Sequence, residues 1–77
     1  MDNKLVEKLK EEFDYRLKTW KEEIISTYGE QTFSYIKELI ETAQTIEDFE
    51  SINRSFDLID TDRVNIKYII DEFYENR

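Results

Sequence analysis

The sequence predicts an all-α fold, a small bundle of three to four helices with one long N-terminal helix. Apolar residues recur every three or four positions through most of the chain, which places them on one face of a helix. Proline is absent and Gly29 is the only glycine, so few positions favour a turn or a linker. A chain of 77 residues suits one hydrophobic core, and residues 1–77 are expected to form a single domain.

The first and longest helix is expected over residues 3–28. At about 1.5 Å per residue it would be roughly 39 Å long, ending where Gly29 can adopt a left-handed conformation. It would be longer than the helices that pack against it and would leave apolar residues uncovered near one end. We therefore expect a homodimer formed either around Leu5, Val6 and Leu9 or around Trp20, Ile24 and Tyr28. Its apolar residues follow one another at helical spacing and are Leu5, Val6, Leu9, Phe13, Leu17, Trp20, Ile24 and Tyr28.

Two shorter helices are expected next, over residues 30–44 and 45–59. Between them, Thr45 stands three residues before Asp48, the spacing at which a threonine hydroxyl caps the free amide groups of a helix start. The apolar residues of the third helix then follow at spacings of three, four and three, which is helical. They are Phe49, Ile52, Phe56 and Ile59.

A fourth helix is expected to start at a cap formed by Asp60, Thr61 and Asp62 and to reach residue 76. Residues 63–70 also permit a strand, because apolar and polar residues alternate there. A lone strand would leave its backbone groups without partners, so the helix is favoured. Together the four helices predict a core of Phe13, Leu17, Trp20, Phe33, Ile36, Ile40, Phe49, Ile52, Phe56, Ile66, Ile70 and Phe73.

The residue types needed for catalysis and metal binding are largely missing. Histidine and cysteine are absent, so the serines have no imidazole base and no thiolate is available. Asp60, Asp62 and Asp71 occupy positions 1, 3 and 12 of a calcium loop, but Val64 at position 5 cannot ligate and Asn65 replaces the glycine of position 6. We therefore predict no enzyme, no catalytic residue, no cofactor and no metal site.

Charge indicates the kind of partner. The formal net charge is -8, which disfavours direct binding to nucleic acid or to an anionic membrane and favours a protein partner with a basic surface. Residues 29–77 carry twelve acidic and five basic residues, so nearly all of the excess lies there. The start of the chain resembles no signal peptide, and a cytoplasmic location is expected.

Candidate partner-binding residues are acids and tyrosines that the helical periodicity places on outer faces. Acids on outer helix faces can also serve solubility alone, and Val64 and Tyr68 could instead contact the first helix. Tyrosine is favoured at interfaces because it combines apolar area with a hydroxyl. The candidates are Glu38, Glu41, Glu47, Glu50, Asp57, Tyr15, Tyr68, Asp71 and Glu75.

In size, acidity and lack of catalytic residues, the chain resembles the small inhibitors of phages and mobile elements, including anti-CRISPR, anti-restriction and DNA-mimic proteins. The resemblance is one of composition, covers no motif and transfers no residue roles. It implies a non-catalytic protein-binding module that docks acidic helices on a basic nucleic-acid-binding site of another protein. The alternative is a structural or assembly protein that self-associates through its long first helix.

Overall fold

The computed structural model describes residues 2–75, and every regular element in that range is a helix. The all-α class is therefore confirmed, with five helices in place of three to four. The molecule is elongated and measures 40 × 19 × 17 Å along its principal axes. The helices are α1 (Asn3–Thr19), α2 (Lys21–Tyr28), α3 (Glu30–Thr42), α4 (Ile46–Leu58) and α5 (Ile66–Glu75).

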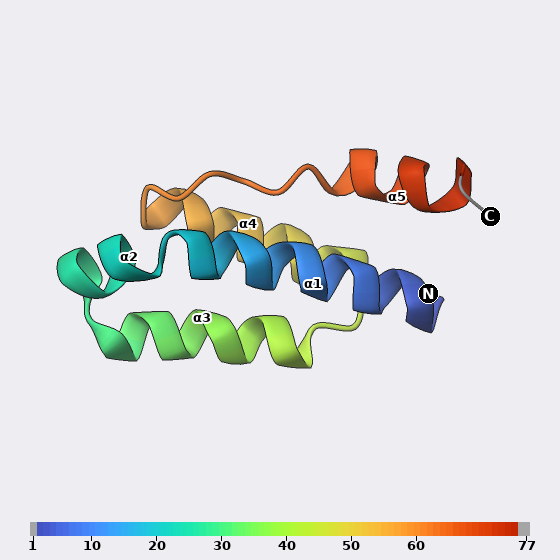
Figure 1. Cartoon of the computed structure of the whole chain (residues 1–77). Coiled ribbons are helices and arrows are strands. Elements are labelled where there is room, and N and C mark those ends of the chain that lie inside the picture. Colours follow the sequence, from blue (N-terminus) through green and yellow to red (C-terminus); the bar gives the residue numbers. More distant parts are fainter. Residues whose placement is uncertain (1, 76–77) are drawn as a thin grey trace.

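Helix α1 is central to the bundle (Figure 1). The chain runs out along α1 and α2, returns along α3, runs out again along α4 and returns through an extended segment into α5. Helix α5 packs on both α1 and α4, and α3 also contacts both of them. The short helix α2 packs mainly on α3 at the opposite end from α5.

The core forms where α1 meets α4. The ring of Phe13 lies 5.2 Å from that of Phe49 and 5.6 Å from that of Phe56, and none of the three is exposed. Such tilted aromatic pairs add to the stabilisation from apolar burial. Eight of the twelve predicted core residues are buried, and the other four pack against the core while half-buried. Those four are Trp20, Phe33, Ile70 and Phe73.

The prediction of one helix over residues 3–28 is wrong, because the helix is interrupted at Trp20. The hydroxyl of Thr19 donates a 2.8 Å hydrogen bond to the carbonyl of Tyr15, a back-bond that weakens and bends helices. Trp20 leaves the α-helical conformation with φ -101° and ψ 8° and serves as both the last cap of α1 and the first of α2. The apolar stripe continues across the interruption, so both helices face the same core.

This interruption shortens the first helix, on whose length the expectation of a dimer rested. Helix α1 has 17 residues and α3 and α4 have 13 each, so α1 exceeds them by little. Leu5, Leu9 and Ile24, which the longer helix would have offered to a second copy, are at most 2% exposed within one chain. The monomer itself covers these three side chains, whereas Val6 and Trp20 are half-buried and Tyr28 is exposed.

The turns at both ends of α3 follow the predicted signals. Gly29 has φ +97°, a backbone conformation that residues with a side chain rarely adopt. At the other end, the hydroxyl of Thr45 accepts from the amide of Asp48, and the Asp48 carboxylate accepts from the amide of Thr45. This is the reciprocal capping box expected from the sequence.

Asp60 belongs to the turn that ends α4, whereas the sequence predicted it to cap the start of the next helix. Its φ is +54°, the left-handed conformation usually taken by glycine or asparagine after a helix. The amide of Thr61 donates to the backbone carbonyl of Phe56 at 2.8 Å, and the amide of Asp60 donates to the backbone carbonyl of Asp57 at 3.2 Å. These two bonds form a Schellman motif, so the same residues that suggested a helix start make a helix stop.

Residues 61–65 are extended and irregular, and α5 begins only at Ile66. Asn65 caps it, since its side-chain oxygen accepts from the amide of Tyr68 at 3.0 Å. Neither a strand nor a helix therefore covers the whole of residues 63–70. Val64, for which the sequence left an outer face or contact with the first helix open, is 4% exposed and belongs to the core. The predicted helix end at residue 76 lies outside the described residues.

Candidate protein-binding surfaces

All nine candidate partner-binding residues lie on exposed surface. Tyr15 is 72% exposed and Tyr68 is 63% exposed, which is high for large side chains that carry much apolar area. The periodicity of the sequence therefore placed each candidate correctly with respect to solvent. The structure divides them among four helices, α1, α3, α4 and α5.

Two arginines lie beside the acidic candidates of α4, one on the helix itself and one in the segment that follows it. The Nε of Arg63 lies 3.0 and 2.9 Å from the two carboxylate oxygens of Asp57, so this carboxylate is already paired. Arg54 stands on the same helix and donates to the hydroxyl of Ser51 at 2.8 Å. Glu50 lines a shallow depression together with Arg54 and Arg63. Of the three acidic candidates on α4, Glu47 and Glu50 form no ion pair within residues 2–75.

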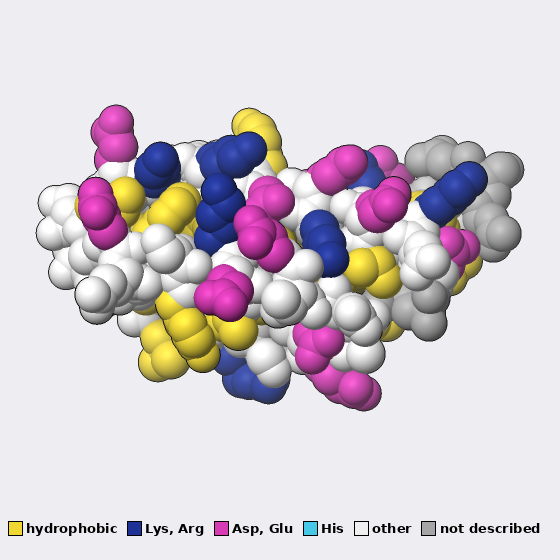
Figure 2. Space-filling view, turned by 90° about the horizontal axis from the view of Figure 1, so that it is seen from below, with side chains coloured by type: hydrophobic (Ala, Val, Ile, Leu, Met, Phe, Trp, Pro, Cys, Tyr) yellow, Lys and Arg dark blue, Asp and Glu magenta, His cyan; other side chains and the backbone are white. Residues whose placement is uncertain are grey.

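The α3 side of the molecule carries both signs of charge. Figure 2 shows lysine and arginine side chains among the acidic ones on this face. Glu41 lies where the ammonium of Lys10 donates to the Glu41 backbone carbonyl at 2.8 Å. Glu38 and Glu41 therefore belong to a mixed surface, and the five acids of α3 and α4 do not form one uniform acidic face.

Helix α5 gathers three candidates on one side. Tyr68, Asp71 and Glu75 follow at spacings of three and four, and all three are exposed, so they share the face that points away from α1 and α4. We call these residues the α5 outer face. A tyrosine beside two carboxylates combines apolar contact area with negative charge, which suits a basic protein surface.

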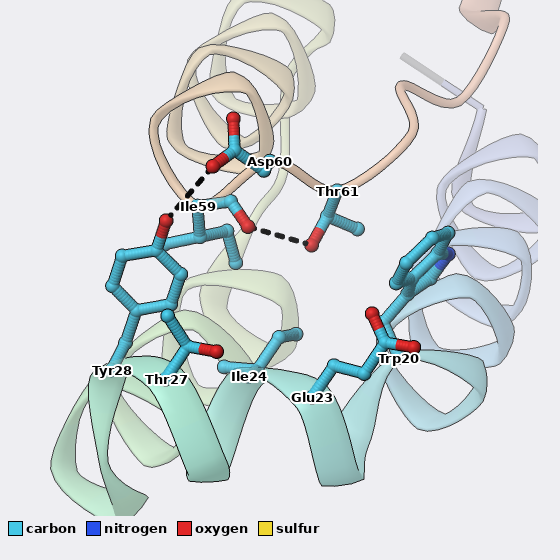
Figure 3. Close-up of a pocket in the computed structure, with 8 residues that line it drawn as sticks. All are labelled: Trp20, Glu23, Ile24, Thr27, Tyr28, Ile59, Asp60 and Thr61. Atoms are coloured by element: carbon cyan, nitrogen blue, oxygen red, sulfur yellow. Dashed lines mark hydrogen bonds between the residues drawn. The ribbon is translucent and has the colours of Figure 1, made fainter.

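A cleft that the sequence did not reveal lies between α2 and the turn that follows α4. Its eight lining residues are drawn in Figure 3, and its volume is about 90 Å³. The hydroxyl of Tyr28 donates to the Asp60 carboxylate at 3.1 Å across the mouth of the cleft. Desolvation, followed by this hydrogen bond and the nearby negative charge, raises the pKa of Tyr28 above its usual 10.0. The cleft joins residues 32 positions apart, which no local pattern could bring together.

A groove with both polar and apolar lining residues lies between α3 and α4. Tyr35 and Leu39 line it from α3, and Ile52 and two serines line it from α4. Tyr35 is 62% exposed, and Leu58 at the end of α4 is 80% exposed. A leucine side chain exposed to this extent adds apolar surface that a partner can cover.

No metal or membrane site emerges from the part of the chain that the structure describes. In residues 2–75 no group of three or more acidic, histidine or cysteine side chains is arranged to hold a metal ion. None of the helices in this range combines the length and the apolar character needed to cross a bilayer. Comparison with known proteins finds no matching family model, no similar curated protein and no similar solved structure.

Proposed function

We propose that this protein is a non-catalytic module that binds a partner protein through a basic surface of that partner. The observation that carries the proposal is that all 19 carboxylates of the chain are exposed or half-exposed, while the net charge is -8. Surface charge of one sign attracts an oppositely charged partner over several ångströms and orients its approach.

Exposed tyrosines supply the apolar area that charge alone does not. Every tyrosine of the chain is at least 38% exposed, and interface energy is concentrated in aromatic and arginine side chains. The α5 outer face joins Tyr68 to Asp71 and Glu75, so it is a strong candidate for first contact. A basic nucleic-acid-binding site on an enzyme is the kind of partner surface that such a module fits, and occupying that site would inhibit the enzyme.

The test begins with capture of the partner from native host lysate and its identification by mass spectrometry. Association rates of the purified pair are then measured at low and high salt. Reversal of Glu47 and Glu50 to lysine should slow association about tenfold at low salt, within the range that electrostatic steering contributes. The same test on the α5 outer face uses Asp71→Lys with Glu75→Lys.

The matched control reverses Glu7 and Glu11 on α1, which are also exposed and change the net charge by the same amount. These residues lie in the nearly neutral first third of the chain, so their reversal should slow association less. Equal slowing by all three pairs would show that net charge alone matters, without a defined surface. An association rate that does not change with salt would overturn the proposal.

A further inference from the structure

The cleft between α2 and the turn after α4 has an apolar floor and two aromatic walls. Ile24 and Ile59 form the floor, and they are 2% and 8% exposed. The rings of Trp20 and Tyr28 stand on opposite sides of this floor, with the indole nitrogen pointing away from the cleft (Figure 3). A ligand between the rings would therefore meet the faces and edges of aromatic carbon rather than the indole N–H group.

Negative charge surrounds the mouth of the same cleft. Glu23 and Asp60 both line it, and no lysine or arginine is among its lining residues. The hydroxyl of Thr61 also belongs to the lining and donates to the carbonyl of Ile59 at 3.4 Å. Aromatic faces beside carboxylates attract cations, because the ring quadrupole and the carboxylate charge act in the same direction.

The conformation of Asp60 places its carboxylate at this mouth. Asp60 has φ +54°, a left-handed conformation that few residues with a side chain adopt. Its carboxylate accepts the hydrogen bond from Tyr28, which fixes both the acid and one aromatic wall. The Schellman turn thus holds a charged group beside the Tyr28 ring, at one side of the cleft (Figure 3).

We propose that this cleft binds the side chain of a lysine of the partner protein, with its methylenes between Trp20 and Tyr28 and its ammonium at Glu23 and Asp60. The proposal rests on the proposed function for the source of that lysine. The volume of about 90 Å³ is about three times the share of one water molecule in the liquid. It therefore has room for an ammonium and its last methylenes.

Lysine fits this geometry better than arginine does. A guanidinium gains most from a carboxylate that accepts two parallel hydrogen bonds. In Asp60, one of the two oxygens already accepts from Tyr28. An ammonium is a compact charge with three rotatable donors, so it can satisfy single oxygens on separate residues.

The test measures binding of small probes without any partner. Nα-acetyl-lysine methylamide is titrated into the protein while tryptophan fluorescence is recorded, because Trp20 is the only tryptophan and lines the cleft. We expect saturation with a dissociation constant on the order of 1–10 mM, as suits a ligand contact of so few atoms. The norleucine analogue, which lacks the ammonium, and the arginine analogue should each bind more weakly.

Two variants and a control locate the site. Glu23→Gln with Asp60→Asn should weaken lysine binding by about threefold to tenfold, the range for two exposed charge contacts. Asparagine tolerates the left-handed conformation, and Glu23→Gln alone provides a second variant that leaves the turn untouched. Glu22→Gln, an exposed neighbour outside the cleft, removes the same charge and should leave binding unchanged.

Equal binding of the norleucine and lysine probes, or unchanged lysine binding in both variants, would overturn the cleft proposal. Stronger binding of the arginine probe would overturn the choice of lysine. None of these outcomes depends on the partner or on the reversal of Glu47 and Glu50. Failure of the cleft and failure of the proposed function are therefore separate results.

Discussion

Helix α4 and the segment 61–75 both pack on α1, but different forces hold them. Helix α4 buries a continuous stripe in which Phe49, Ile52 and Phe56 are at most 2% exposed. The segment 61–75 begins with a non-helical stretch held by polar side chains, and its helix α5 buries only Ile66 and Ile69. Burial of apolar area is the larger contribution in the first region, and specific hydrogen bonds position the second.

The polar attachment of segment 61–75 centres on one buried amide. The side chain of Asn53 donates to the carbonyl of Val64 at 2.8 Å and accepts from its amide at 2.9 Å. Arg16 adds a hydrogen bond of 3.1 Å to the carbonyl of Arg63. The side chain of a helix residue thus takes the place of the neighbouring strand that an extended segment normally needs. One side chain, that of Asn53, makes both hydrogen bonds to Val64, so a single substitution can remove them.

The largest expected effect is on α4. Phe56→Ala should lower the free energy of unfolding by about 3 to 5 kcal/mol, because it leaves a cavity among Phe13 and Phe49. Urea unfolding followed by circular dichroism measures this change. The control Leu58→Ala, at a residue 80% exposed, should change stability by less than about 0.5 kcal/mol. A loss below about 1 kcal/mol for Phe56→Ala would contradict its place in the core.

A smaller and more local effect is expected for segment 61–75. Asn53→Ala removes both hydrogen bonds to Val64 and leaves two buried backbone groups without a partner, which should cost about 1 to 3 kcal/mol. Amide hydrogen exchange should show loss of protection in α5, while α1, α3 and α4 keep theirs. The neighbouring exposed Arg54→Ala serves as the control. Uniform loss of protection over all helices would show that the two regions unfold as one unit.

The same contrast explains how much of the fold could be predicted. Helix α4 was predicted to within one residue at either end, because its capping box and its apolar spacing are local signals. Segment 61–75 was misread at its start, because Asp60 and Asp62 resemble a helix cap in sequence. Whether an aspartate starts a helix or ends one depends on the backbone around it. Nothing in the sequence marked Asn53 either, since its partner lies 11 positions away.

The same limit applies to the candidate partner-binding residues and to the cleft. The exposure of the nine predicted residues follows from the helical spacing of apolar residues, so it could be predicted from the sequence. The pairing of Asp57 with Arg63 and the cleft at Trp20 depend on how the turn after α4 folds back. The interruption at Trp20 was also hidden, because the apolar spacing continues unbroken from Leu17 to Ile24. Local periodicity therefore predicts which faces are free but not which residues meet across them.

The smallest expected effect is the change in stability that acid causes at the starts of α4 and α5. The amides of Gln44 and Thr45 donate to the Asp48 carboxylate at 2.9 and 3.1 Å, and these backbone hydrogen bonds lower the pKa of Asp48 below its usual 3.8. A carboxyl whose pKa is lowered on folding stabilises the fold above its unfolded pKa. That contribution is lost as the pH falls through the folded pKa. Helix α5 is capped by the uncharged Asn65, so its start should not respond to acid in this way.

Asp48→Asn and Asn65→Ala test this difference between the two starts. Unfolding free energies of both variants and the unmodified protein are measured at pH 7 and near pH 2. The difference between the unmodified protein and Asp48→Asn should narrow in acid, because protonation neutralises Asp48 in the unmodified protein, whereas the amide of the variant is neutral at both pH values. The loss from Asn65→Ala, about 1 kcal/mol for a missing cap, should stay the same at both pH values, since no titrating group takes part in that cap. A constant difference for Asp48→Asn would mean that its charge contributes nothing to the start of α4, and the contrast between an ionic and a neutral cap would then disappear.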